Sequence, residues 1–443
     1  MQPVSKERMI MKQDYSKQRD IVDKICQDVV LPKMVKVRQV FDKSHLEPEE
    51  IPDIVFQHLS QAEIAGQIHE NDRIAIAVGS RGITNMALIA KSVVEFVKSK
   101  KAIPFIFPSM GSHGGATAEG QRALLAGYGV TEEYCGCPIL STMETVQIGE
   151  LESGMPVFMD KNAHDADGII LTGRIKAHTA FRAPHESGLM KMSVIGMGKQ
   201  QGAETVHESG FENMGELMPK VAKVVLGYAN VICGLGIIEN AYDQTYKLEA
   251  LTKEEIWTKE PELLVEAKSK MGRILFDEID ELVVDEIGKD ISGDGMDPNV
   301  TGRFACYKSA SGGIEVKRIV VLDLTEKTHG NFNGLGVADI TTKRCFDKMD
   351  ADETYPNGVT STVLDVVKVP IVTRRDETAI KLGLKTCNGT DKSNPYIVRI
   401  RNTKDLEEIY ISEAMLEEAK KNPDIQILGE PEEWAFDEQG NLF

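Results

Sequence analysis

The chain has 443 residues, with 51 basic and 69 acidic side chains and a formal net charge of −18. Such a surface repels phosphate backbones and anionic membranes, so the composition argues against nucleic acid or a membrane as a partner. A small anionic substrate stays compatible with it, because a basic pocket can exist inside an acidic molecule.

The length exceeds what one compact core holds, at roughly 100–200 residues per domain. We expect two domains, 1–280 and 281–443, with the last residues packing back on the first domain. The longest apolar stretch, 224–238, is interrupted by Gly and Asn and is shorter than the ~20 residues that cross a bilayer. A polar first segment without a secretory pattern and seven cysteines, an odd number, favour a cytoplasmic protein with reduced thiols.

Strands and helices alternate in the first half of the chain. A β-branched run at 73–80 predicts a buried strand, and apolar residues at helical spacing predict a helix over 85–100. A second strand follows at 102–110 and a second helix at 116–129, with Thr117 as a candidate helix cap. This β-α-β-α order is typical of a parallel sheet with crossover helices. Further strands are predicted at 167–173 and 230–238.

The second half repeats this character with a strand at 314–324 and a helix at 412–422, for which Ser412 is a candidate N-cap. A polar, Gly-rich loop at 328–344 carries Asn333 and Asp339, which either reach a cleft or form a surface turn. The predicted fold class is therefore α/β, with two α/β domains, a mainly parallel sheet in the first and an active-site cleft between them.

Two loops follow strands of the first half, at the sheet edge where ligands collect in open α/β sheets. In the loop 79–82, Arg81 offers a guanidinium that could hold a phosphate or a carboxylate, although a surface arginine in a turn explains it equally well. In the loop 108–117, His113 lies among glycines, which allow a backbone to approach a ligand closely. A structural role for His113 is the open alternative.

The stretch 173–207 carries the strongest local signal. It holds His178, His185 and His207, a third of the nine histidines, together with Lys191. Histidines shuttle protons or bind transition metals near neutral pH, and a lysine in an apolar pocket can act as a nucleophile. A solvated basic loop explains each residue singly; their combination indicates a site.

The ordered set of His113, His178, Lys191 and His207, with glycines between them, resembles the nickel-dependent lactate racemase family, best over residues 73–210. The resemblance implies nickel in a pincer nucleotide, a pyridinium-3,5-bisthiocarboxylic acid mononucleotide, which Lys191 tethers and proteins of cofactor synthesis supply. It implies His207 as the nickel ligand and His113 and His178 as the acid/base pair of a reversible hydride transfer. Cofactor contacts are then expected at the positions Ser80, Arg81 and Gly196.

The chain departs from the lactate enzymes in two places. The segment between His178 and Lys191 is longer and adds His185 and Glu186. The second domain carries Asn299 and Arg303 where the lactate enzymes have a glutamine and a lysine on the substrate carboxylate. We therefore predict a racemase or epimerase of a larger 2-hydroxy acid or sugar acid, contacted by Asn299, Arg303 and His185, in a possible homodimer.

Two other classes of protein fit the same residues. One is a zinc or manganese hydrolase or lyase that uses His113, His178 and His207 with an aspartate such as Asp167. The other is a catalytically idle ligand-binding protein built on the same two-domain cleft. Metal analysis separates the first alternative from a nickel racemase, and racemisation of a panel of hydroxy acids separates the second.

Overall fold

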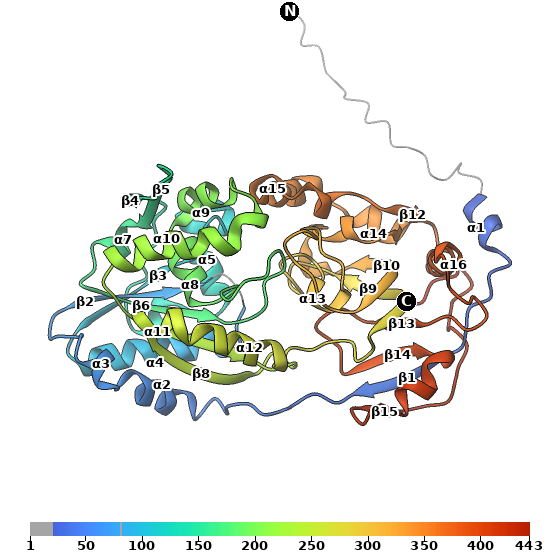
Figure 1. The fold of residues 1–443 in the computed structure, drawn as a ribbon, viewed down its shortest axis with the longest axis horizontal. Coiled ribbons are helices and arrows are strands. Elements are labelled where there is room, and N and C mark those ends of the chain that lie inside the picture. Colours follow the sequence, from blue (N-terminus) through green and yellow to red (C-terminus); the bar gives the residue numbers. More distant parts are fainter. Residues whose placement is uncertain (1–20, 80–81) are drawn as a thin grey trace, which may run out of the picture.

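The structure is a computed structural model that describes residues 21–79 and 82–443. Two α/β bodies lie side by side along the long axis, each built on its own sheet (Figure 1). We call the body with the five-stranded sheet the first body and the one with the eight-stranded sheet the second body.

The sheet of the first body has the strand order β3-β2-β6-β7-β8. Its strands are β2 (Arg73–Val78), β3 (Ile103–Pro108), β6 (Gly168–Arg174), β7 (Val231–Glu239) and β8 (Thr245–Thr252). The first four run parallel, and β8 turns back antiparallel to β7. The predicted α/β class with a mainly parallel first sheet is confirmed.

Helices cover both faces of this sheet because each presents an apolar stripe to it. One face packs against α2 (Ile51–Leu59), α4 (Met86–Ser99) and α5 (Ala118–Gly127), and the other against α8 (Leu189–Lys191), α9 (Lys199–His207), α10 (Met214–Tyr228), α11 (Lys253–Thr258) and α12 (Glu260–Lys270). Short helices α3 (Ala62–Ala65), α6 (Glu132–Cys135) and α7 (Lys161–His164) and the hairpin of β4 (Thr145–Glu150) and β5 (Pro156–Asp160) complete the body. The predicted cap of α5 is confirmed, since the Thr117 hydroxyl accepts from Gly120 N at 3.0 Å.

The sheet of the second body has the order β12-β11-β10-β9-β13-β14-β1-β15. Its strands are β1 (Met34–Gln39), β9 (Glu278–Ile287), β10 (Glu315–Leu324), β11 (Ile340–Thr342), β12 (Ile371–Thr373), β13 (Ile397–Ile400), β14 (Glu408–Ser412) and β15 (Ile425–Ile427). Around it lie α1 (Ile21–Cys26), α13 (Pro298–Thr301), α14 (Lys343–Lys348), α15 (Ala351–Ser361), α16 (Asp376–Thr386) and α17 (Leu416–Ala419).

The strand β1 comes from the first forty residues yet pairs antiparallel with β14 and β15 (Figure 1, blue among red). Its Val35 and Val37 are fully buried in the core of the second body. The division at residue 280 placed this segment in the first domain. The structure places it in the second body instead. The sequence could not show this, because a six-residue alternating run carries no information about which distant sheet it joins.

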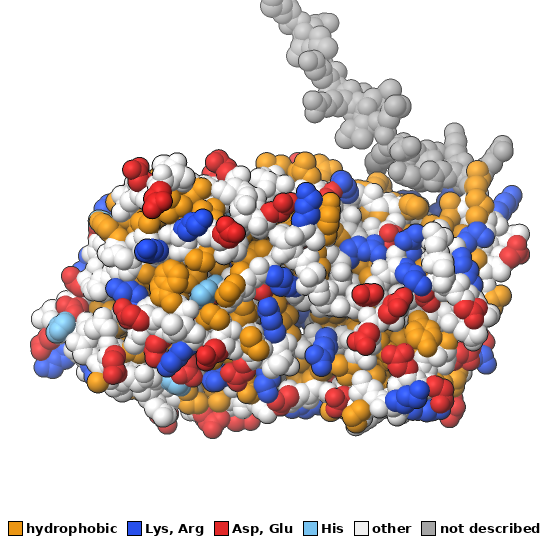
Figure 2. All heavy atoms as spheres, viewed as in Figure 1, with side chains coloured by type: hydrophobic (Ala, Val, Ile, Leu, Met, Phe, Trp, Pro, Cys, Tyr) orange, Lys and Arg blue, Asp and Glu red, His pale blue; other side chains and the backbone are white. Residues whose placement is uncertain are grey.

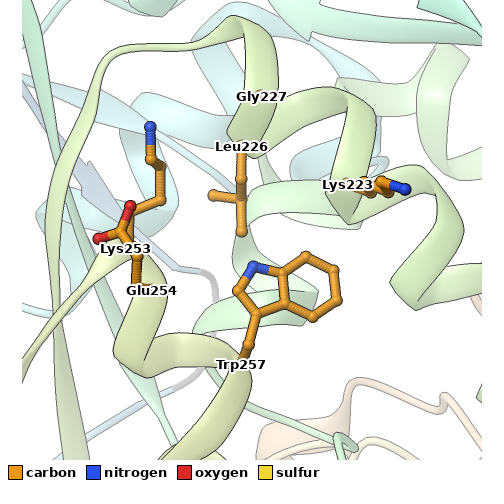
Figure 3. A pocket seen from close by; sticks show the side chains of 6 residues that line it. All are labelled: Lys223, Leu226, Gly227, Lys253, Glu254 and Trp257. Carbon is orange, nitrogen blue, oxygen red and sulfur yellow. The ribbon is translucent and has the colours of Figure 1, made fainter.

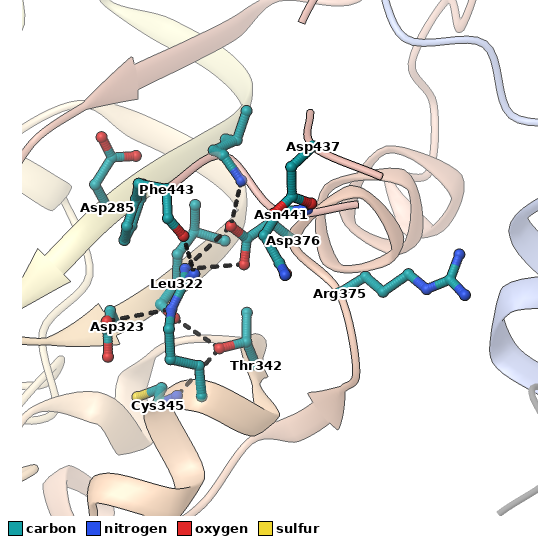
Figure 4. A network of polar contacts seen from close by, with 12 residues as sticks. Asp285, Leu322, Asp323, Thr342, Cys345, Arg375, Asp376, Asp437, Asn441 and Phe443 are labelled. Carbon is teal, nitrogen blue, oxygen red and sulfur yellow. Dashed lines mark hydrogen bonds and ion pairs between the residues drawn. The ribbon is translucent and has the colours of Figure 1, made fainter. Parts of the chain in front are cut away.

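The last residues do not pack on the first body, as the sequence suggested, but on the second (Figure 4). Arg344 donates to the carbonyl of Phe443 at 2.6 Å and to the Asp376 carboxylate at 3.0 Å. The same carboxylate accepts from Leu442 N at 2.8 Å. One arginine and one aspartate thus hold the end of the chain.

The helix predicted over 412–422 is only a 3-10 turn and the four-residue α17, and Ser412 does not cap it. Its hydroxyl donates to Pro395 O at 2.7 Å and accepts from Ile397 N at 3.0 Å. The hydroxyl therefore completes the backbone bonding at the start of β13 instead.

Acidic and basic side chains are interspersed over the face shown in Figure 2, with hydrophobic side chains in small groups between them. None of the helices in the described part of the chain is long and apolar enough to cross a membrane.

Candidate active site

A cleft of ≈ 1350 Å³ lies between the two bodies. One wall consists of the loops that follow β2, β3, β6 and β7, and the other of loops and α15 from the second body. The cleft is lined by His113, His178, Lys191, Gly196 and His207, among others. The parallel strands bring His113 and His178 together because their carboxyl ends meet at one edge of the sheet, while Lys191, Gly196 and His207 reach the cleft from α8, the turn that follows it and α9.

His178 lies four residues after the end of β6, and both of its ring nitrogens are engaged. Nδ1 accepts from the backbone N–H of Ala180 at 3.0 Å, and Nε2 lies 2.8 Å from Lys191 Nζ. Burial, and then the charge of Lys191, lower the pKa of His178 well below its usual value. The imidazole is therefore neutral at physiological pH and able to accept a proton.

Lys191 ends the short helix α8, and a π-helical turn (Met192–Gly196) follows it directly. Turns of this kind recur at functional sites. The carboxyl group of Glu260 accepts from Met190 N at 3.0 Å and so holds the start of α8. A Cβ at Gly188 would lie 2.1 Å from Glu260 Oε1, which is why a glycine is needed there.

His207 is the last residue of α9, and burial, and then the charge of Lys191, lower its pKa to about 4. Its Nδ1 is buried and has no hydrogen-bond partner among the described residues. Phe211 lies against both histidines, with ring centroids 5.5 Å from His207 and 6.1 Å from His178. Sequence reasoning missed Phe211, since no pattern marks a single aromatic residue at the start of a three-residue 3-10 helix.

His113 follows β3 and is exposed at the cleft. Hydrogen bonds to backbone carbonyls hold its loop in place. Gln121 donates to the carbonyl oxygens of Gly111 at 2.9 Å and His113 at 3.2 Å. A Cβ at Gly196 would lie 2.5 Å from Ser109 Oγ, so the π-helical turn can approach this loop only with a glycine. The predicted cofactor contacts Ser80 and Arg81 lie outside the described residues.

The lengthened segment after His178 is built around Glu186, whose side chain is fully buried. Its carboxylate accepts from His178 N at 2.7 Å and from Lys268 Nζ at 2.6 Å. The sequence marked Glu186 as an added residue in the segment between His178 and Lys191, but it did not indicate what the residue does. It fixes the backbone at His178.

His185 does not line the cleft in this structure. The residue is 7% exposed, its Nε2 lies 3.0 Å from Ile256 O, and its ring packs edge-on against Trp257. This placement gives His185 a packing role in the first body in place of the predicted substrate contact. The sequence could not tell this histidine from its neighbours.

The other two predicted substrate contacts are engaged within the protein. Asn299 accepts from Arg182 and donates to Asp297 at 2.8 Å, so it belongs to a contact between the two bodies. Arg303 lines the cleft, yet its guanidinium is bonded to the Asp339 carboxylate and to backbone carbonyls. Asn333 does reach the cleft.

The alternative metal site with Asp167 is not assembled. Asp167 accepts from Arg73 N at 2.7 Å, at the amino ends of β2 and β6, whereas His113 and His178 follow the carboxyl ends of β3 and β6. Among residues 21–79 and 82–443, no three His, Cys, Asp or Glu side chains converge as a metal-binding group.

A smaller pocket of ≈ 440 Å³ lies between α10 and α11 on the first body (Figure 3). It is lined by Lys223, Leu226, Gly227, Lys253, Glu254 and Trp257. It contains no histidine and none of the predicted site residues, so the cleft is the candidate active site.

Comparison with known proteins bears on the fold and on the first part of the chain. The fold and the cleft define a two-body α/β protein with a lysine and three histidines in the cleft between the bodies, and residues 21–216 match the family model of the lactate racemase N-terminal domain. Residues 21–216 are therefore similar to the lactate racemase N-terminal domain.

Two solved structures show the same fold. The lactate racemase apoprotein from Thermoanaerobacterium thermosaccharolyticum matches with a TM-score of 0.50 and 15% identity, over 84% of this chain and 99% of that one. A Thermotoga maritima protein solved by structural genomics matches with a TM-score of 0.50 and 12% identity, over 83% and 99%. No curated protein matches the chain by sequence.

Proposed function

We propose that the protein is a racemase or epimerase of a 2-hydroxy acid, or of a related sugar-acid-like alcohol, that uses a nickel-pincer nucleotide tethered to Lys191. One observation carries this proposal. The Lys191 amine lies 2.8 Å from His178 Nε2 in a cleft that also contains His207, whose buried Nδ1 has no partner among the described residues.

The residues fit this cofactor. His207 is neutral at physiological pH and keeps a lone pair, as a nickel ligand requires. Lys191 would hold the organic part, and Gly196 lines the same cleft. When bound, the cofactor would supply a reversible acceptor for the hydrogen on the substrate carbon.

The protein's own part is to move the proton of the substrate hydroxyl. His178 is neutral in its resting state and can take this proton at a ring nitrogen and return it. His113, on the loop after β3, would do the same for the other enantiomer. Acylation of Lys191 would remove the charge that helps to lower the pKa of His178, so tethering would make His178 a stronger base.

The wall formed by the second body supports a substrate larger than lactate. The cleft of ≈ 1350 Å³ leaves room beyond a nucleotide, and Asp294, Asn331 and Asn333 contribute polar groups to its lining. Such groups suit the hydroxyls of a sugar acid. The proposal also includes the proteins of cofactor synthesis as partners, a homodimer, and a cytoplasmic location, which fits the free cysteines.

The test is to express the protein with a pincer-synthesis pathway and to measure its intact mass, its nickel content and the racemisation of a panel of hydroxy acids. We expect an adduct of the mass of the nucleotide that is lost in Lys191→Ala, and nickel that is lost in His207→Ala. An adduct that survives Lys191→Ala contradicts the tether. Loaded protein that racemises nothing points instead to a ligand-binding protein.

A further inference from the structure

A fully buried lysine lies under the loop that carries His113. Lys199 is 0% exposed, and its Nζ donates to Pro108 O, at the end of β3, at 2.9 Å. The same amine donates to Gln121 Oε1 and lies 3.4 Å from Asp160 Oδ2. Lys199 is the first residue of α9, the helix that ends at His207.

Gln121 connects this lysine to the loop. It is also 0% exposed, and while its Oε1 accepts from Lys199, its Nε2 donates to the carbonyls of Gly111 at 2.9 Å and His113 at 3.2 Å. One Lys–Gln pair therefore holds the backbone of the loop at three points, at residues 108, 111 and 113. It joins that loop to the helix of His207.

The conformation and the burial of Lys199 both lower the stability of the fold. Lys199 adopts a φ of +54°, a left-handed conformation that side chains with a Cβ disfavour. Burial lowers the pKa of Lys199 and raises that of Asp160. Two apolar side chains of the same volume would often fill such a site at lower cost. Strained and buried charged groups of this kind recur where a site has to be held in one geometry.

We propose that Lys199 and Gln121 are positioning residues that set the His113 loop against the helix of His207. The inference rests on the proposed function for the role of His113, but the coupling of loop and helix does not depend on it.

The decisive variant is Gln121→Glu. A glutamate still accepts from Lys199, and so keeps the buried amine satisfied, but at neutral pH it cannot donate to the carbonyls of Gly111 and His113. Lys199→Met removes the centre of the network and serves as a second variant. The matched controls are Gln147→Glu and Lys161→Met, since both side chains are exposed on the same body.

Two measurements separate positioning from stability. Hydrogen exchange of the cofactor-free protein should be faster over 109–114 in Gln121→Glu and unchanged in β10, with both controls like the wild type. In the loaded enzyme, kcat should fall roughly 10–100-fold while KM changes little, because misplaced groups slow the chemical step.

Unchanged loop exchange in Gln121→Glu overturns the coupling, and faster exchange with an unchanged kcat overturns the positioning of His113. If the loaded wild type has no activity but the exchange result is as expected, the coupling stands and the proposed function fails.

Discussion

At the scale of single residues, burial and the charge of Lys191 together set the protonation of both histidines in the cleft. After burial, the positive charge of Lys191 is the strongest influence that lowers the pKa of both His178 and His207. Lys176 acts on His178 alone. Removal of Lys191 should therefore change the pKa of both histidines, whereas removal of Lys176 should change only that of His178.

We predict that Lys191→Met raises the pKa of both His178 and His207 in the cofactor-free protein. A positive charge disfavours protonation of a nearby imidazole, so its removal shifts both pKa values upward. Titration of labelled histidine rings by NMR measures this. Lys176→Met is the control and should raise the pKa of His178 while leaving His207 unchanged. A His207 pKa that does not move in Lys191→Met contradicts the electrostatic coupling.

The sequence indicated which residues gather in the cleft but not what each one touches. His113 and His178 could be placed together because strand ends of a parallel sheet converge, and Lys191 through the resemblance to the lactate racemase family. His185 could not be separated from them, since its burial depends on Ile256 and Trp257, some 70 residues later. Pairwise contacts over such separations leave no local pattern.

At the scale of elements, the short helix α8 depends on a residue outside it. Glu260 accepts from the amide of Met190 at the start of α8, and burial raises the pKa of Glu260 to about 8. Neither α8 nor the π-helical turn after it was predicted, because a three-residue helix has no periodicity and its support comes from α12.

We predict that Glu260→Gln stabilises the protein at pH 9 and changes little at pH 5. The folded pKa of about 8 exceeds the ordinary 4.5, so between these values the unfolded chain binds fewer protons and the free energy of unfolding falls as pH rises. Within that window the free energy of unfolding falls by up to about 1.4 kcal/mol for each pH unit. A glutamine still accepts from Met190 N and does not ionise.

The measurement is the unfolding free energy, or the melting temperature, of wild type and variant at both pH values. Glu262→Gln, an exposed neighbour on α12, is the control and should track the wild type. Equal differences from the wild type at pH 5 and pH 9 would show that Glu260 does not titrate in this range.

At the scale of the whole molecule, the first sheet was predictable and the second was not. Helices separate the parallel strands β2, β3, β6 and β7 along the chain, so the local pattern indicates a mainly parallel sheet, but it did not reveal β8, which turns back antiparallel to β7. The second sheet takes β1 from one end of the chain and β15 from the other. Its assembly therefore depends on pairings across almost the entire sequence, which no window of residues reveals.

The two bodies are joined through Arg182, on the segment after His178. Its guanidinium donates to Ser311 O at 2.9 Å and to Asn299 Oδ1 in the second body, and to His178 O at 2.6 Å in the first. It also lies over the ring of Phe304, with its carbon 5.0 Å from the centroid. One side chain thus connects the closure of the cleft to the backbone of His178.

We predict that Arg182→Met loosens the contact between the bodies and raises the radius of gyration measured by small-angle X-ray scattering. Each hydrogen bond from a charged group contributes about 1.5–3 kcal/mol to stability, and a methionine side chain makes none of these hydrogen bonds. Arg182→Lys should recover little of the contact, because an ammonium cannot span the same acceptors.

Lys308→Met is the matched control: its ion pair with Glu212 also joins the bodies, but both side chains are more than half exposed, at 62% and 60%. Exposed pairs contribute about 0–1 kcal/mol, so this variant should scatter like the wild type. Equal scattering of Arg182→Met and Lys308→Met would mean that the apolar packing between the bodies, and not the arginine, holds the cleft together.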